Sequence, residues 1–382
     1  MDNRDINVKY TSMSAQELDS ITIEGFKSVA SIEKLKLRPI NVVIGPNGSG
    51  KSNFVGAFSF LQALHDGNLQ EYVARAGGAD KILHFGSKAT QQLLIRISFE
   101  EGVNQYEVKL QANVQDELFA NEEKVFFWDK KKYPRPYETP LSRLGREAGI
   151  SDQRAQKTAS YVRKRIGGWR IYHFHDTSPL SPMKKIADVN DNRYLRPDGS
   201  NLPSFLAFLK LKEPNAYQLI RRLIQQVTPF FDDFQLEPTN LNPDKIRLEW
   251  RHKGSDKYFD ASSLSDGTMR FMALATLFLQ PIQYRPSMIL VDEPELGLHP
   301  FAITMLASLI KSASTDTQVV VSTQSPFLLD HFRPEDVLVA DRVDGGTQLT
   351  RLSSDSLASW LDDYSLGQLW EKNQFGGRPS GG

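Results

Sequence analysis

Residues 45–52 read Gly-Pro-Asn-Gly-Ser-Gly-Lys-Ser, and they directly follow the apolar run Asn41-Val-Val-Ile44. This is the complete pattern of a phosphate-binding loop, which joins a buried strand to the start of a helix. Its glycines allow backbone angles that turn successive N–H groups inward around an anion. The stretch 41–64 therefore predicts a strand, a loop and a helix that together hold a nucleoside triphosphate.

The residues of this loop are expected to hold ATP and Mg2+. Lys51 places a positive charge beside the β- and γ-phosphates, and the Ser52 hydroxyl is a ligand for the metal ion. A helix that begins near Lys51 adds the positive end of its dipole. The predicted nucleotide-binding residues are the whole loop and the residue after it, namely Gly45, Pro46, Asn47, Gly48, Ser49, Gly50, Lys51, Ser52 and Asn53.

A second stretch, residues 288–294 with the sequence Met-Ile-Leu-Val-Asp-Glu-Pro, reads as a buried parallel strand that ends in two carboxylates. Asp292 at the strand end is placed to hold Mg2+ beside Ser52. Glu293 is placed to take a proton from the water that attacks the γ-phosphate. The alternative is a core strand followed by a solvated acidic turn.

Residues 264–268, Leu-Ser-Asp-Gly-Thr, precede an apolar helical stretch from Met269 to Gln280. Ser265 and Gly267 would then lie at a helix start, where a hydroxyl, free N–H groups and the helix dipole attract an anion. Taken alone, the pattern is equally typical of a capped turn.

The order of these motifs resembles that of ABC-type ATPases, with Asp-Glu-Pro-Glu-Leu-Gly-Leu-His-Pro at residues 292–300. The resemblance is closer to the RecF, SMC and OLD group than to transporters. The near-terminal stretch 366–379 also resembles predicted ATPases that often lie in bacterial defence neighbourhoods. Within that group, residues 21–28 resemble the first strand and loop, which places Lys27 at the nucleotide. Residues 322–326 resemble the switch loop, which makes Gln324 the sensor of the γ-phosphate.

The resemblance implies an α/β fold, a two-lobed ABC ATPase head with a parallel or mixed sheet behind the phosphate loop and an antiparallel β lobe. It also implies a homodimer that sandwiches ATP between the Gly45–Ser52 loop of one subunit and Ser265 and Gly267 of the other. The switch residue is usually histidine in transporters. Because Gln324 cannot titrate near neutral pH, hydrolysis is expected to be slow, with Glu293 as the sole base.

The spacing of the motifs predicts the organisation of the chain. Gly45 and Leu264 lie 219 residues apart, more than a compact transporter domain needs, yet no heptad run predicts a long coiled coil. A short insertion, partly helical, should fill the interval. The expected segments are 1–120 (first lobe), 121–170 (basic aromatic insertion), 171–263 (lobe-linking strand, helical subdomain and hairpin) and 264–382 (second lobe).

The segment Lys124–Arg170 carries thirteen Lys or Arg residues against four Asp or Glu, a net charge of +9 in a chain whose formal net charge is zero. Aromatic residues are interleaved with the charges: Trp128, Tyr133, Tyr137, Tyr161 and Trp169. Basic charge beside aromatic rings suits phosphate neutralisation and base stacking, so the segment is a candidate nucleic-acid surface. The alternative is a solvated face that pairs with acidic groups of this chain or of a partner.

Histidines near two of the motifs allow further hypotheses. His173 and His175 fall on one face of a strand expected over 170–176, and with Asp176 they could bind a metal ion, although structural histidines are the plainer interpretation. The Asp176-Thr177 turn could instead act as the lobe-linking loop of the family. His299 either caps the helix that follows it or lies where two subunits meet.

Composition narrows the function classes. The chain has 382 residues and no cysteine, which excludes disulfides and thiolate metal sites and is typical of a cytoplasmic protein. No 18-residue apolar run or leader pattern predicts a membrane segment. We expect an ATPase that acts as sensor or regulator in phage defence or DNA maintenance, with a separate effector protein such as a nuclease or toxin. The alternative is an ATP-bound scaffold that hydrolyses very slowly.

Overall fold

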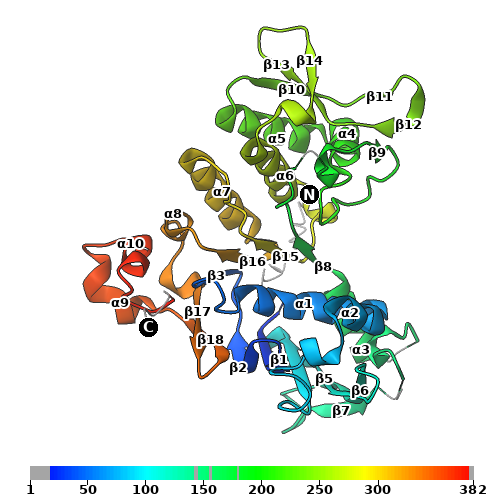
Figure 1. Ribbon diagram of the computed structural model, residues 1–382, viewed down its shortest axis with the longest axis vertical. Helices are drawn as coiled ribbons and strands as arrows, with labels where there is room; N and C mark the ends of the chain where they lie inside the picture. Colours follow the sequence, from blue (N-terminus) through cyan, green and yellow to red (C-terminus); the bar gives the residue numbers. More distant parts are fainter. Residues whose placement is uncertain (1–17, 142–144, 155–156, 179, 378–382) are drawn as a thin grey trace, which may run out of the picture.

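The computed structural model describes residues 18–141, 145–154, 157–178 and 180–377. Two six-stranded sheets and the helices around them form the molecule, and a group of helices and short strands stands above them in Figure 1. The longest described helix, α1 (Lys51–Asp66), has 16 residues, so the described part of the chain contains no long coiled coil. The expected α/β architecture is confirmed.

The first sheet carries the strand that precedes the phosphate loop. Its strands, in spatial order, are β18 (Gly346–Arg351), β17 (Val337–Val343), β3 (Ile40–Ile44), β16 (Gln318–Thr323), β15 (Met288–Asp292) and β8 (Trp169–Tyr172). All neighbours in it are parallel except the pair of β17 and β18. Because β3, β16 and β15 point the same way, their carboxyl ends share one edge, and ligands of such sheets bind there.

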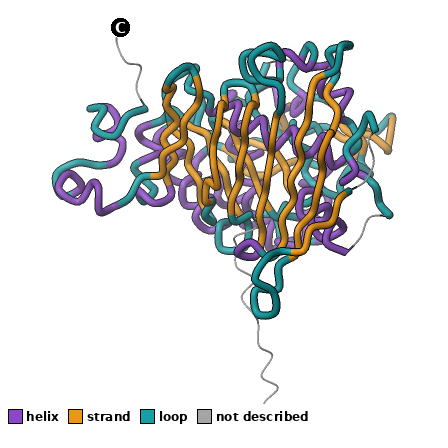
Figure 2. The backbone as a smooth tube through the Cα atoms, turned by 90° about the horizontal axis from the view of Figure 1, so that it is seen from below, coloured by secondary structure: helices purple, strands orange, loops and turns teal. Residues whose placement is uncertain are grey.

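The second sheet is wholly antiparallel, and Figure 2 shows strands side by side with helices behind them. Its order is β2 (Val29–Lys36), β1 (Ser20–Phe26), β4 (Leu93–Phe99), β5 (Asn104–Ala112), β6 (Leu118–Phe127) and β7 (Tyr137–Pro140). The alternating pattern of Leu93–Phe99 buries every second side chain, as the sequence predicts. This sheet forms the predicted antiparallel β lobe.

Helix α1 lies between the two sheets and joins them into one core. Its aromatic side chains Phe54, Phe58 and Phe60 are fully buried in a cluster that contains residues of both sheets. In β15, Met288 and Leu290 face this cluster, whereas Ile289 and Val291 face the cluster on the other side of the sheet. The strand is apolar throughout because both of its faces are covered.

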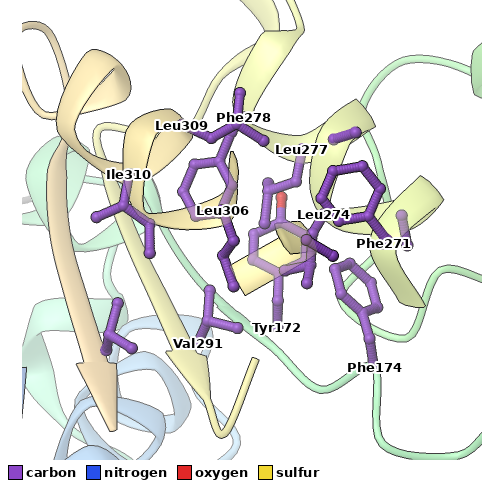
Figure 3. Packing of buried hydrophobic residues seen from close by; sticks show 14 of the residues in the cluster. Tyr172, Phe174, Phe271, Leu274, Leu277, Phe278, Val291, Leu306, Leu309 and Ile310 are labelled. Atoms are coloured by element: carbon purple, nitrogen blue, oxygen red, sulfur yellow. The ribbon is translucent and has the colours of Figure 1, made fainter. Parts of the chain in front are cut away.

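The second core lies on the opposite face of the parallel sheet. Helices α6 (Asp266–Leu279) and α7 (Pro300–Ala313) pack over β15 and β8, and Figure 3 shows Phe271, Leu274 and Leu306 near Val291 and Tyr172. Helices α4 (Leu202–Lys212) and α5 (Pro214–Val227) continue this core. Hence α6 is buried along most of its length, and only its first turn is open to solvent.

The remaining elements surround these cores. The helices are α2 (Leu69–Ala76), α3 (Lys157–Gly167), α8 (Pro326–Leu329), α9 (Ser354–Leu361) and α10 (Leu366–Glu371). Two three-stranded sheets contain β10 (Phe231–Gln235), β13 (Glu249–His252) and β14 (Tyr258–Asp260), and β11 (Pro238–Thr239), β12 (Asn242–Ile246) and β9 (Ala187–Asp188). Among the described helices, none is long and apolar enough to cross a bilayer.

Three local expectations differ from the structure. The boundary predicted at residue 121 falls inside β6, because that strand completes the antiparallel sheet instead of opening an insertion. In the sequence Leu219 falls on an apolar stripe with Ile220 and Leu223, which predicts burial, yet its side chain is 52% exposed. Ile246, Leu248 and Trp250 alternate with polar residues, which predicts one strand, but the structure divides this stretch between β12 and β13, which pair in different sheets.

Candidate nucleotide-binding site

The phosphate loop leaves the carboxyl end of β3 and enters α1, as its sequence predicts. Gly48 and Gly50 have φ angles of 81° and 100°, which favour glycine. A Cβ atom at Gly50 would lie 1.9 Å from the Thr347 hydroxyl oxygen, so a larger residue cannot fit without a shift. Helix α1 begins without a side-chain cap and without an acidic residue in its first turn. Its N-terminal dipole therefore faces the loop uncompensated.

Lys51 lies inside this loop. Its ammonium donates hydrogen bonds to the carbonyl oxygens of Gly45 (2.7 Å) and Pro46 (3.0 Å). Burial lowers the pKa of Lys51, and the negative charges of Glu293 and Asp292 act in the opposite direction. The lysine is thus within electrostatic reach of both predicted carboxylates, which is the arrangement that its predicted role requires.

A hydroxyl network supports the loop from outside. Thr347 on β18 donates to the Ser49 carbonyl oxygen at 2.9 Å and lies 2.7 Å from the Ser28 hydroxyl oxygen. The Asn53 amide also donates to Ser28, at 2.7 Å. Lys27, the residue before Ser28, has a φ of 49°, and burial lowers its pKa. The sequence indicated Lys27 and Asn53 but not the two hydroxyl residues that link them to the loop.

The carboxyl ends of β15 and β16 bring the predicted base and sensor together. Asp292 pairs in register with Ser322, and the Glu293 amide donates to the Ser322 carbonyl oxygen at 2.7 Å. Glu293 has a φ of 39°, so the chain turns sharply at this residue. The Gln324 side-chain amide donates a hydrogen bond to the Glu293 carboxylate. The predicted γ-phosphate sensor, Gln324, is therefore in contact with the predicted general base, Glu293.

Glu295 is a third carboxylate at this edge, and it is 8% exposed. It accepts hydrogen bonds from the Thr323 hydroxyl and, at 3.4 Å, from the Gln324 amide N–H. Its other oxygen, Oε2, is buried and has no partner in the described chain. Burial raises the pKa of Glu295. Its bonds hold the switch loop against the strand end, so we regard Glu295 as a positioning residue.

The start of α6 presents the second predicted anion-binding end. Ser265 caps the helix by accepting from the Thr268 N–H at 3.2 Å, and its side chain is exposed. A Cβ atom at Gly267 would lie 2.2 Å from the Gly297 carbonyl oxygen, so this glycine allows α6 to meet the turn after Glu295. Neither Ser265 nor Gly267 forms a described hydrogen bond to the phosphate loop of the same chain.

Arg270, one turn into α6, is the functional candidate that the sequence analysis missed. It is 4% exposed, and its guanidinium donates to the carbonyl oxygens of Phe174 (2.9 Å) and His175 (3.2 Å). Burial lowers its pKa, and the charges of Asp266, Glu295 and Glu293 act in the opposite direction. Arg270 is the single charged residue in the run 269–279, and this was the available signal. Its side chain fixes the segment after β8 to α6.

The histidine hypotheses have separate outcomes. The rings of His173 and His175 lie 6.2 Å apart, and no group of three metal-binding side chains occurs within the described residues. Burial lowers the pKa of His173, His175 lowers it further, and Asp292 acts in the opposite direction. Asp176 accepts from the Ser178 N–H at 3.0 Å. His299 caps α7 through its Nδ1 atom, which accepts from Phe301 N–H at 3.3 Å.

The residues present fit a triphosphate with Mg2+. The loop offers a buried ammonium and the Ser49 hydroxyl oxygen, which is buried and has no partner in the described chain. The Ser52 hydroxyl and the Asp292 carboxylate provide the oxygen ligands that Mg2+ prefers. No residue of this set conflicts with the expected ligand.

The chain is similar in sequence to known proteins. A family model described as "AAA domain, putative AbiEii toxin, Type IV TA system" matches residues 40–330. The chromosome partition protein Smc of Mycobacterium tuberculosis is 30% identical over 112 residues, which are 24% of this chain and 9% of that protein. Smc of Desulfitobacterium hafniense is 56% identical over 45 residues, 12% of this chain and 4% of that protein. The chain thus spans a small fraction of these relatives' length.

Two solved structures show the same fold. An Smc head bound to the C-terminal winged-helix domain of ScpA has a TM-score of 0.60 and 15% identity, over 90% of this chain and 99% of that one. An Smc head with an extended coiled coil, bound to the C-terminal domain of ScpA from Pyrococcus furiosus, has a TM-score of 0.55 and 14% identity, over 91% and 98%. These likenesses concern the fold alone.

Proposed function

The chain belongs to the family of AAA domains described as putative AbiEii toxins of type IV TA systems, and from this premise we propose that it is a Mg2+-dependent ATPase. Lys51 and the loop amides hold the triphosphate, while Ser52 and Asp292 hold the metal ion. Bound Mg2+ supplies charge that neutralises the phosphate oxygens. Glu293 accepts the proton of the attacking water, and Gln324 orients both the water and the Glu293 carboxylate.

The observation that carries the proposal is the contact of Gln324 with Glu293, opposite the Lys51 ammonium. A general base must lie within hydrogen-bond reach of the water that it activates. The amide of Gln324 holds the carboxylate at the strand end, where that water would approach the γ-phosphate. Because the Gln324 side chain does not titrate, Glu293 alone accepts the proton of the attacking water, which supports slow turnover.

We further propose that two copies close around ATP. Ser265 is exposed at the start of a long buried helix, as a group that contacts a second subunit would be. The exposed side chains of Leu296 and Phe301 flank the His299 cap beside it. ATP would hold the two copies together, and hydrolysis would release them. Each nucleotide would then receive contacts from both chains.

The biological role that we propose is that of a sensor or regulator in phage defence or DNA maintenance, in the cytoplasm, with a separate effector such as a nuclease or toxin. The similar Smc heads are bound to ScpA, a different protein, which supports a protein partner for this chain as well. The family description, with its reference to a toxin system, supports the defence context. A scaffold that retains ATP is the competing role.

Replacement of Glu293 by Gln tests the reaction. The variant keeps the size of the side chain but cannot accept a proton, so single-turnover hydrolysis should fall at least about a hundredfold. Light scattering with ATP should show a persistent dimer for Glu293→Gln and a transient one for the wild type. Ser265→Arg should prevent that dimer. Equal turnover in Glu293→Gln and the wild type would exclude our assignment of the base and favour the scaffold.

Nucleic-acid binding is a second candidate function, favoured by the loop between β6 and β7. Tyr133 and Tyr137 are 59% and 72% exposed there, and Arg135 between them has no acidic partner in the described chain. Other residues of Lys124–Arg170 are not free to bind a nucleic acid, because Trp169 is fully buried and Lys124 pairs with Glu122 and Glu138. Changing Lys130, Lys131 and Lys132 to Glu should abolish retention of DNA or RNA at low salt. Unchanged retention would exclude this surface.

A further inference from the structure

A cavity of about 510 Å3 lies at the amino-terminal edge of the parallel sheet, opposite the edge that carries the phosphate loop. Helix α3, the start of β8 and the segment before β15 line it. The Ser287 N–H donates to the Gly168 carbonyl oxygen at 3.0 Å where the two strands begin. Since β15 rises about 3.3 Å per residue, roughly 17 Å separates Ser287 from Asp292. The cavity is therefore distinct from the triphosphate site.

The lining of this cavity is strongly cationic. It contains five Lys or Arg residues and no Asp or Glu: Lys164, Arg165, Arg170, Arg193 and Arg285. Lys164 and Arg193 are exposed and have no carboxylate partner in the part of the chain that the structure describes. Burial lowers the pKa of Arg285, and its Nε atom has no hydrogen-bond partner among the described residues. Such a concentration of positive charge favours an anionic ligand.

Aromatic rings stand beside these charges. The Arg170 guanidinium lies 5.4 Å from the centre of the Tyr194 ring, and the Arg165 guanidinium lies 5.0 Å from that of Tyr161. Tyr194 is 42% exposed, so one face of its ring is open to a ligand. Tyr284 also lines the cavity, and its ring meets that of Phe208 edge-on, with 5.3 Å between the ring centres. Rings held next to guanidinium groups suit a planar base.

We propose that this cavity binds a nucleotide unit, with its phosphate on Lys164 and Arg193 and its base against Tyr194. The volume is within the range of small-molecule sites, and guanidinium groups match phosphate oxygens geometrically. The ligand is either a free mononucleotide or the 5′-phosphorylated end of a nucleic acid, since both present this chemistry. The site does not depend on hydrolysis at Lys51, so it goes beyond the proposed ATPase function.

The test uses the full chain with Lys51→Ala, which removes triphosphate binding at the loop. AMP, a 5′-phosphorylated single-stranded hexanucleotide and its unphosphorylated twin are titrated by calorimetry or fluorescence anisotropy. The double variant Lys164→Ala/Arg193→Ala should raise the Kd of every phosphorylated ligand that binds by about tenfold or more. The matched control Arg222→Ala/Lys257→Ala removes two exposed cations elsewhere, neither of which has an acidic partner among the described residues, and should leave the Kd unchanged.

The ring has its own test. Tyr194→Ala should weaken binding about tenfold, whereas Tyr194→Phe keeps the stacking face and should restore it. Binding of AMP identifies a free nucleotide, and binding of the phosphorylated hexanucleotide alone identifies a nucleic-acid end. Both results support the site. No binding of any probe at about 1 mM, or equal weakening by the control pair, overturns it. If Lys51→Ala unfolds, Lys51→Met, which keeps most of the side chain but removes the charge, replaces it.

Discussion

Replacing Thr347 by Val should destabilise the protein and weaken ATP binding together. The Thr347 hydroxyl is buried, with the residue 3% exposed, and it bonds the Ser49 carbonyl oxygen at 2.9 Å and the Ser28 hydroxyl at 2.7 Å. Valine has nearly the same shape but removes both bonds. Loss of a buried hydrogen bond costs about 1–3 kcal/mol, so we expect a loss of about 2 kcal/mol in the free energy of unfolding.

The same change should reach the nucleotide, because Ser49 and Gly50 form the part of the loop that Thr347 supports. If about 1–2 kcal/mol of loop positioning is lost, the Kd for a non-hydrolysable ATP analogue rises roughly fivefold to thirtyfold. Urea unfolding measures the first effect, and fluorescence titration of the analogue measures the second. Thr347→Ser returns the hydroxyl and should recover most of both.

The control is Thr350→Val, on the same strand β18 with an exposed side chain. This change should alter stability by less than about 0.5 kcal/mol and leave the Kd unchanged. If Thr347→Val behaves like Thr350→Val, the hydroxyl network does not support the loop. If stability falls but affinity does not, the network is structural only.

Two further changes test the close contacts and the buried carboxylate. Gly267→Ala should lower the free energy of unfolding by about 1–3 kcal/mol and prevent ATP-dependent dimerisation, because its Cβ would meet the Gly297 carbonyl oxygen at 2.2 Å. The control Gly56→Ala, within α1 and free of close contacts, should raise the free energy of unfolding by about 0.5–1 kcal/mol in the same urea series. Burial raises the pKa of Glu295, so folding favours its protonated form, and the wild type loses stability as pH rises above the ordinary glutamate pKa of about 4.3. Glutamine at position 295 does not titrate, so the unfolding free energy of Glu295→Gln relative to the wild type should be higher at about pH 8 than at about pH 4. The same difference at both pH values would contradict the argument.

The sequence predicts those parts of the site whose information is local. The loop at 45–52, the strand before it and the carboxylates after β15 each follow from a few adjacent residues with a strict pattern. Thr347 could not be predicted in this way, because it lies 298 residues from Ser49 and meets it only when β17 pairs with β3. The same holds for the contact between Arg270 and Phe174.

Composition is a poor guide where strand pairing decides the environment of a charge. Lys124 adds to the basic charge of the segment 124–170, yet β6 brings it next to Glu122 and Glu138, which compensate it. The sequence offers Trp169 as a stacking ring, yet β8 carries it into the core between the sheets. A charge count over 47 residues ignores which face of a strand each side chain lies on and which residue it meets on the next strand. It therefore cannot separate paired from free cations. Lys164 on α3 and Arg135 between β6 and β7 have no acidic partner in the described chain.

The two halves of the proposed ATP site differ in how firmly the fold holds them. Asp292 and Glu293 end a strand that is buried on both faces, so their backbone is fixed whether or not a second copy is present. Ser265 is exposed and Gly267 is half-buried in the first turn of α6, and Arg270 connects that turn to the segment after β8 near His173. A force that moves the first turn must therefore either break the two Arg270 hydrogen bonds or move that segment. Because the charge of Asp292 already acts on the His173 pKa, such a movement would change the electrostatics at the edge of the sheet where we propose that Mg2+ binds. Contact with the second copy would in this way adjust the first copy's own site as well as complete it.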